Sequence, residues 1–176
     1  MKTLILLALL GIVSPAMAAE APAPAEKTEQ PAKAEAPAPE TEQKPGEYEC
    51  KYYKVQLPDE WKAIIPPTDQ QGTINAIFAT NTGSSVVTMI VGPSGGADIK
   101  TIATMFAEQF KAPRAPSDKN GQYVFSFPIQ NGTAQAIVSG SGPDFMVTTI
   151  AGSLKQAQEF LRNNVSSENY SSLMPK

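Results

Sequence analysis

Two short stretches carry the residue types that could do chemistry, and the first is "QLPDEW" at 56–61. It puts the only tryptophan of the 176-residue chain directly after two adjacent carboxylates, Asp59 and Glu60. Neighbouring residues of an extended chain point apart, whereas paired acid–base work needs two carboxyl groups that face one substrate. We therefore predict a solvated turn at Asp59-Glu60, followed by a strand whose Trp61 packs in the core or at its rim with its indole N–H hydrogen-bonded. The alternative is a tryptophan that contacts a ligand.

The second stretch, "GPSGG" at 92–96, matches the G-x-S-x-G nucleophile elbow of serine hydrolases. That class needs a histidine to accept the serine proton, and the chain contains none. Lys100 is near in sequence, but we expect it in the first turn of a helix, where nothing desolvates it. A hydrolase acting through Ser94 is therefore the least favoured hypothesis, and a plain turn is predicted. Gly95-Gly96 before a helix could also hold an anion through backbone N–H groups.

The composition argues against most other catalytic and metal sites. The absence of histidine and the single cysteine exclude the usual zinc, copper and iron–sulfur sites, and no EF-hand or Walker pattern is present. We expect a protein that is not an enzyme, with no catalytic residue, no metal and no cofactor. Residues 47–176 hold 11 acids and 10 bases, so a nucleic-acid partner has no electrostatic basis.

The first 18 residues predict a secretory signal peptide. Lys2 precedes an apolar run from Leu4 to Val13, and small residues follow where a signal peptidase cleaves, which predicts cleavage between Ala18 and Ala19. The run is too short to span a bilayer, which needs about 20 residues, so we expect no membrane insertion after cleavage. The exported protein is expected in the periplasm, with an extracellular location as the alternative.

Residues 19–46 predict a disordered linker. The segment is rich in Ala, Pro and Glu and contains no aromatic or large aliphatic side chain. With nothing to bury, it cannot offset the entropy cost of becoming ordered. It is either a solubilising tail or an arm that docks on a partner.

Cys50 is the only cysteine, so the chain can form no internal disulfide. In an oxidising compartment such a thiol is either buried as a small apolar group or reactive. The sequence favours burial.

Residues 47–176 are predicted to form one folded domain. Alternating apolar residues predict four strands in its first part, at 53–57, 61–65, 73–80 and 84–92. The second strand is expected to stop at Pro66-Pro67.

Asn81-Thr82-Gly83 is expected to form a hairpin turn between the third and fourth strands. The apolar spacing then changes to that of a helix, with Asp98 as N-cap and Pro113 as its end. One face of this helix is predicted to consist of Ile99, Ile102, Ala103, Phe106 and Phe110.

The second half repeats this order, with strands predicted at 122–129, 133–140 and 145–152. Asn131-Gly132 and residues 141–144 are the expected turns, and Pro128 predicts a sheet edge or a bulge.

Residues 153–156 fit a capping box at the start of the last helix. The residues expected to be buried on it are Leu154, Ala157, Phe160, Leu161 and Val165. The fold class is therefore α+β, a mostly antiparallel sheet of about six to seven strands in the order ββββ-α-βββ-α, with helices packed on it.

The run "YYKVQLPDEWKAII" at 52–65 resembles the opening of PsbP/DcrB-like domains, in which a strand ends in Leu-Pro and a tryptophan starts the next strand. "DIKTIATMFAEQF", "GQYVFSFPIQNGTAQAIV" and the helix after "TIAGS" extend the resemblance over roughly residues 50–165. Glu60 stands where such families often have glycine. The resemblance implies an α/β/α sandwich and a binding or assembly role, and it transfers no site residue because partners differ widely within the fold.

Three functions are consistent with these observations. The favoured one is a secreted, periplasmic, non-catalytic module that binds a protein or another component of the bacterial envelope. The first alternative is a carrier with an apolar pocket between sheet and helix, walled by Tyr52, Trp61 and phenylalanines. The second is the hydrolase at Ser94.

Overall fold

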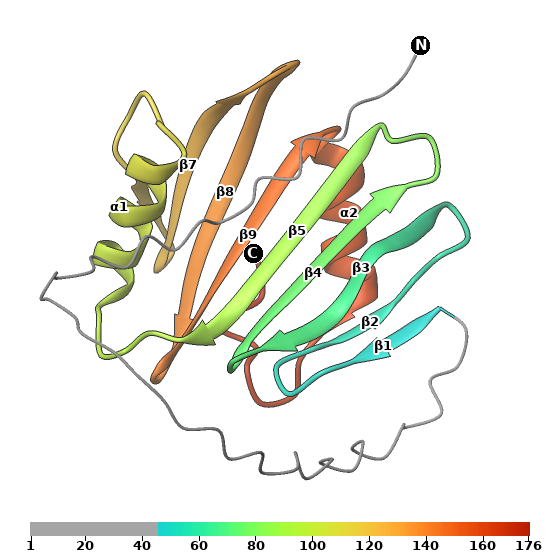
Figure 1. The fold of residues 1–176 in the computed structure, drawn as a ribbon, viewed down its shortest axis with the longest axis horizontal. Helices are drawn as coiled ribbons and strands as arrows, with labels where there is room; N and C mark the ends of the chain where they lie inside the picture. The colour runs from blue at the N-terminus through green and yellow to red at the C-terminus, as the bar shows by residue number, and fades with distance from the viewer. Residues whose placement is uncertain (1–45) are drawn as a thin grey trace, which may run out of the picture. The chain divides into compact units, whose positions relative to one another are not determined.

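A computed structural model describes residues 46–176 (Figure 1). The predicted signal peptide, its cleavage between Ala18 and Ala19, and the linker up to residue 45 lie outside the described residues. The described part is an α+β fold with a seven-stranded antiparallel sheet, a small second sheet and two helices.

The large sheet has the strand order β3-β4-β5-β9-β8-β7-β6, and every neighbouring pair is antiparallel. Its strands are β3 (Trp61–Gln70), β4 (Thr73–Thr80), β5 (Ser85–Pro93), β6 (Ser117–Lys119), β7 (Gln122–Ile129), β8 (Gly132–Ser141) and β9 (Asp144–Gly152). The central pair β5–β9 joins the two halves of the chain along its whole length, from Ser85↔Gly152 to Pro93↔Asp144.

Three short strands were not predicted, and they change the expected element order. β1 (Glu47–Glu49), β2 (Lys54–Gln56) and β10 (Val165–Ser166) form the small sheet, while β6 pairs with β7 at the edge of the large one. The first predicted strand is thus β2, outside the large sheet. Strands of two or three residues carry too little alternation to be recognised from sequence.

The prediction that the strand beginning at Trp61 stops at Pro66-Pro67 is wrong, because β3 continues to Gln70. β3 is an edge strand, and its register shifts between Ala63 and Ile65 and again between Ile65 and Thr68. Prolines are tolerated at edges and bulges, where their missing N–H breaks no ladder bond. Pro128 follows the same rule, since β6 covers β7 only at residues 122–124.

The hairpin between β4 and β5 forms as predicted, and so does the turn at Gly142-Pro143 between β8 and β9. The β7–β8 turn lies one residue earlier than predicted. Ile129 pairs with Gly132, so Gln130 and Asn131 are the turn residues.

Helix α1 (Ile99–Gln109) begins with Asp98, whose carboxylate accepts the N–H of Thr101 at 3.0 Å, as predicted. It ends four residues before Pro113, contrary to the prediction. Lys111 adopts φ +55°, and the N–H groups of Lys111 and Ala112 donate to the carbonyls of Glu108 and Ala107. This is a Schellman end, so backbone geometry terminates the helix before the proline.

Helix α2 (Leu154–Asn164) begins with Ser153, whose hydroxyl accepts the N–H of Gln156. Only this half of the predicted capping box forms. The N–H of Ser153 donates to the carbonyl of Ser84, and the Gln156 side chain accepts from the Ser84 hydroxyl. Leu154 was expected to be buried and is 40% exposed, whereas Ala157, Phe160, Leu161 and Val165 are buried as predicted.

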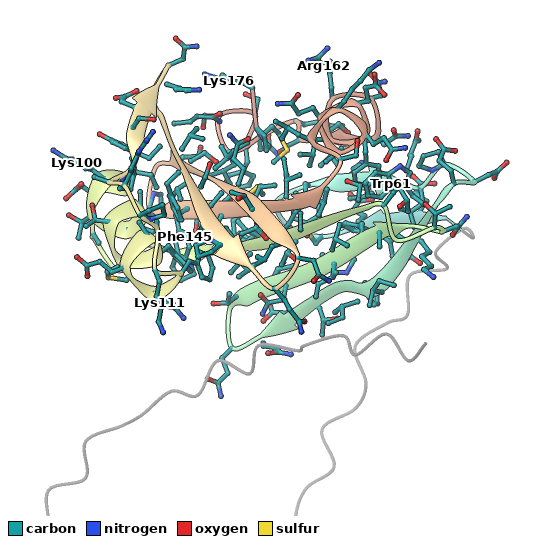
Figure 2. The ribbon with its side chains drawn as sticks, turned by 90° about the horizontal axis from the view of Figure 1, so that it is seen from above. Trp61, Lys100, Lys111, Phe145, Arg162 and Lys176 are labelled. Carbon is teal, nitrogen blue, oxygen red and sulfur yellow. The ribbon has the colours of Figure 1, made fainter. Side chains whose placement is uncertain are left out.

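The two helices pack against different strands and different clusters of apolar side chains (Figure 2). Along β8, Ile137 belongs to the cluster beneath α2, whereas its neighbours Ala136 and Val138 belong to the cluster beneath α1. Because successive residues of a strand point to opposite faces, the two clusters lie on opposite faces of the sheet.

The C-terminal segment also helps to close the core. Leu173 is fully buried, and its carbonyl accepts a hydrogen bond from the Ser139 hydroxyl on β8. The Gln122 amide donates to the carbonyl of Met174 at 2.8 Å. These bonds tie the end of the chain to β7 and β8.

We expect Phe160→Ala to lower the free energy of unfolding by about 3–5 kcal/mol, because this side chain is 2% exposed and its loss leaves a cavity between α2 and the sheet. Leu154→Ala on the same helix is the control and should cost less than about 1 kcal/mol. Urea denaturation measures both. Equal losses would contradict the assignment of the two faces of α2.

Candidate functional site

Ser94, the predicted nucleophile of the least favoured hypothesis, lies in the turn between β5 and α1. Its N–H donates to the carbonyl of Pro143 at 2.7 Å, and its hydroxyl accepts the N–H of Gly96 at 3.3 Å. Lys100 is exposed on α1, and no hydrogen bond joins it to Ser94 in the described part of the chain. The serine therefore closes a turn.

At the possible anion site, the N–H of Gly96 already donates to the Ser94 hydroxyl, and a carboxylate caps the start of α1. Asp98 accepts from the N–H and from the hydroxyl of Thr101, the latter at 2.7 Å. The hydrogen bond from the Thr101 hydroxyl, followed by that from its N–H, lowers the pKa of Asp98. The N-terminus of α1 thus holds its own anion.

The candidate site is an open pocket of about 390 Å³, which we call the Trp61 pocket. This volume lies near the lower end of the range for small-ligand sites, about 300–1,000 Å³. Three elements meet there, namely the corner before β3, the β4–β5 turn and one side of α2. The lining residues are Pro58, Glu60, Trp61, Thr80, Asn81, Thr82, Gln156, Glu159, Phe160, Asn163 and Asn164. A second hollow, of about 400 Å³, is lined only by Asp98 and α1 and lacks an opposing wall.

One hydrogen bond closes the corner itself, and two hold it against the β4–β5 turn. The N–H of Trp61 donates to the carbonyl of Pro58 at 2.9 Å. Asn81 donates twice, from its N–H to the carbonyl of Glu60 at 2.8 Å and from its side chain to the carbonyl of Asp59 at 2.7 Å. The predicted turn at Asp59-Glu60 is confirmed, and both side chains are exposed.

Trp61 and Phe160 form the aromatic floor of the pocket. Trp61 is 7% exposed, and its ring stacks on Phe160 with centroids 4.1 Å apart and planes 15° apart. The predicted core position of Trp61 is confirmed. The predicted hydrogen bond of its indole N–H does not form among residues 46–176, and the nitrogen is not one of the sealed, unpaired polar atoms there. The N–H therefore keeps some access to solvent, and Trp61 is one of the residues that line the pocket.

Several polar groups of the rim are also free. The Gln156 carbonyl oxygen is occupied by the Ser84 hydroxyl at 3.0 Å, and Asn81 uses its amide as described above. Glu60, Glu159 and Asn163 make no side-chain hydrogen bond to any other described residue. The rim therefore presents carboxylate oxygens and an amide to solvent.

Among residues 46–176, no basic side chain lines the Trp61 pocket. Lys155 and Arg162 lie on α2, but within residues 46–176 neither forms an ion pair with Glu60 or Glu159, and the ion pair found there is Lys54–Glu49 at 3.2 Å. Figure 2 shows Arg162 pointing outward from α2, away from Trp61. The two carboxylates consequently give the pocket a local excess of negative charge.

Sequence reasoning found the Trp61 side of the pocket and missed the α2 side. Gln156, Glu159 and Asn163 recur at a spacing of three or four residues beside the apolar stripe of α2. Such spacing places them on one face of the helix, but it is equally typical of any solvated helix face. The signal is present in the sequence without being specific.

A buried hydrogen bond between Tyr52 and Asp144 lies at the end of β5 and β9 that is opposite the Trp61 pocket. The hydroxyl of Tyr52 donates to Asp144, which is 7% exposed, at 3.0 Å. The ring of Tyr52 packs edge-on against Tyr170, and the Lys51 ammonium lies 4.7 Å from its centroid and donates to its hydroxyl. Burial raises the pKa of Tyr52. Tyr52 thus joins the β1–β2 loop to the β8–β9 turn and faces the core. It is not among the residues that line the Trp61 pocket, although it was expected to wall a ligand pocket.

Cys50 lies in the same loop and is half-buried. Burial raises the pKa of its thiol, which favours the unreactive protonated form. Tyr53 is 2% exposed, its hydroxyl has no hydrogen-bond partner in the described structure, and burial, followed by the influence of Cys50, raises its pKa.

Two further findings concern residues 46–176 alone. They contain no group of three or more acidic, histidine or cysteine side chains placed to hold a metal ion. None of their helices combines the length and the apolar character needed to cross a membrane.

The fold defines a class of protein, an α+β domain built on a seven-stranded antiparallel sheet with an open polar pocket along one side of α2. No family model matches the chain, and no curated protein matches it.

We expect Tyr52→Phe to lower the free energy of unfolding by about 1–3 kcal/mol, because it leaves the buried Asp144 carboxylate without its donor. Tyr48→Phe is the matched control, since no described residue bonds its hydroxyl, and it should change little. Chemical denaturation at neutral pH tests the pair. A loss no larger than that of the control would mean that the bond contributes nothing.

Tyr53→Phe should instead leave stability at neutral pH unchanged or raised, because it removes a buried hydroxyl without a partner. The pKa of Tyr53 is higher in the folded state than in the unfolded state. Its protonated hydroxyl therefore contributes fully to the free energy of unfolding below the unfolded pKa, and this contribution is lost as pH rises above about 10. Above that pH the wild type should lose stability more steeply than the variant, by up to about 1.4 kcal/mol per pH unit. Parallel pH profiles would contradict this expectation.

Proposed function

We propose that the protein is an exported, non-catalytic module that binds a partner of the bacterial cell envelope in the Trp61 pocket. The observation that carries this proposal is the combination of a nearly buried tryptophan, whose N–H has no partner among the described residues, with two unpaired carboxylates on separate elements. Free directional groups around a preformed aromatic floor favour specific binding, since a ligand can satisfy them without reorganising the protein.

Catalysis has less support at this pocket. Its lining contains no histidine, cysteine or lysine that could act as nucleophile or proton acceptor beside the two glutamates. The Ser94 hydroxyl is engaged in its own turn. We therefore do not propose the hydrolase.

A carrier with an apolar pocket is also less well supported. Among the lining residues only Pro58, Trp61 and Phe160 are apolar, and both aromatic rings are more than nine-tenths buried. An apolar ligand gains little from such a surface, because the polar rim would lose water without regaining hydrogen bonds.

A large apolar docking patch is not supported either. Four large apolar side chains of the described domain are more than a third exposed, and they lie on four different elements: Ile64, Met105, Ile129 and Leu154. Scattered apolar residues of this kind are normal on a protein surface. Recognition is therefore better explained by the polar pocket.

The finer fold description and the location belong to the same proposal. We propose an α/β/α sandwich similar to PsbP/DcrB-like domains, and the packing of α1 and α2 on different clusters of one sheet supports it. The signal-peptide pattern supports export to the periplasm. The near-neutral domain supports a partner other than nucleic acid.

The test is site-specific photo-crosslinking in the organism that makes the protein. A crosslinking amino acid at Asn163, on the pocket rim, should capture one defined partner, whereas the same group at Met105, 58% exposed on α1, should not. Because Asn163 lies on the pocket rim, a crosslinker there lies within reach of a bound partner. Capture that is equal at both positions, or absent at Asn163, would overturn the proposal.

A further inference from the structure

The Trp61 pocket combines two chemical demands that few ligands meet together. Glu60 from the corner and Glu159 from α2 face it without a cation among the lining residues. Trp61 lines the same space, and its indole N–H, a donor only, has no partner among the described residues and is not sealed from solvent. A ligand must therefore supply both positive charge and a hydrogen-bond acceptor.

We propose, on the basis of the function proposed above, that the partner presents a basic peptide segment to this pocket. A lysine or arginine side chain of the partner lies between Glu60 and Glu159, and a backbone carbonyl of the segment accepts the N–H of Trp61. A peptide carries both groups within one residue's length. An isolated metal ion or simple amine lacks the acceptor.

The carboxylates are available for such a cation. Both glutamates are exposed and free of ion pairs with other described residues, so no internal bond has to break when a partner binds. Charge-assisted hydrogen bonds to ammonium or guanidinium groups are about twice as strong as neutral ones. Lys62, the basic residue next to Trp61 on β3, points to the other face of that strand, since successive strand residues alternate.

The chain's own N-terminal segment is a poor occupant because of its composition. Residues 19–45 contain six glutamates and three lysines, which gives a net charge of −3. A segment of net negative charge is not complementary to a pocket lined by two glutamates, whereas a basic segment is.

Trp61, the single tryptophan, makes the test direct because its fluorescence reports the pocket alone. We would titrate the chain beginning at Ala19 with the pentapeptide acetyl-Ala-Ala-Lys-Ala-Ala-amide and with its matched peptide carrying Gln in place of Lys. The lysine peptide should give a saturable change in emission. It should bind at least about tenfold more tightly than the neutral peptide, and more weakly when salt is raised to about 0.5 M.

The variants Glu60→Gln and Glu159→Gln should each weaken the lysine peptide, and the double variant should abolish the preference over the neutral peptide. Glu108→Gln on α1 is the matched control and should have no effect. All three substituted positions are exposed, and unchanged melting temperatures of the four variants would confirm that folding is intact.

Equal binding of the two peptides, or binding of neither by the folded protein, would overturn the inference. Binding of a neutral sugar such as maltose at the same site, lost in the glutamine variants, would overturn it in favour of a polyol ligand. If Asn163 still captures a partner while the peptides fail, the proposed function stands and only the basic-peptide assignment fails. If both fail, both are wrong.

Discussion

The stacking of Trp61 on Phe160 joins the edge of the large sheet to helix α2, and both the core and the pocket depend on it. Phe160 also packs against Phe78 on β4, so one aromatic residue of the helix contacts two neighbouring strands. Such pairs contribute about 0.5–1.5 kcal/mol beyond the burial of their area. More importantly, the stack sets where α2 lies, and this position brings the polar side of the helix to the β4–β5 turn.

Binding groups and stabilising groups are separated around this stack. The buried faces of the two rings stabilise the fold, while the rim atoms remain in water and contribute little to stability. Glu60 and Glu159 are exposed to solvent, whereas Asp144 is buried and accepts a hydrogen bond from Tyr52. The glutamates on the rim are therefore available to bind a partner, while the Tyr52–Asp144 hydrogen bond stabilises the fold.

Local features of the fold could be predicted because their causes are local. Asp98 and Ser153 cap helices through side-chain oxygens that reach N–H groups three residues away, and the β4–β5 hairpin follows from its turn residues. The predictions failed where contacts with distant parts of the chain determine the structure. β3 continues through Pro66-Pro67 because it is an edge strand, and Leu154, the first residue of α2, is 40% exposed although its spacing fits the apolar stripe.

The sequence by itself determined the strand and helix periods, the turn before Trp61, and the lack of histidine that removes the common catalytic and metal chemistries. Only the tertiary structure decided that Glu60 and Glu159, about a hundred residues apart in the chain, line one pocket. The reason is physical. Short-range capping and side-chain periodicity act over three or four residues, whereas the meeting of the corner with α2 depends on strand order and on the aromatic stack. Neither of these has a local signature.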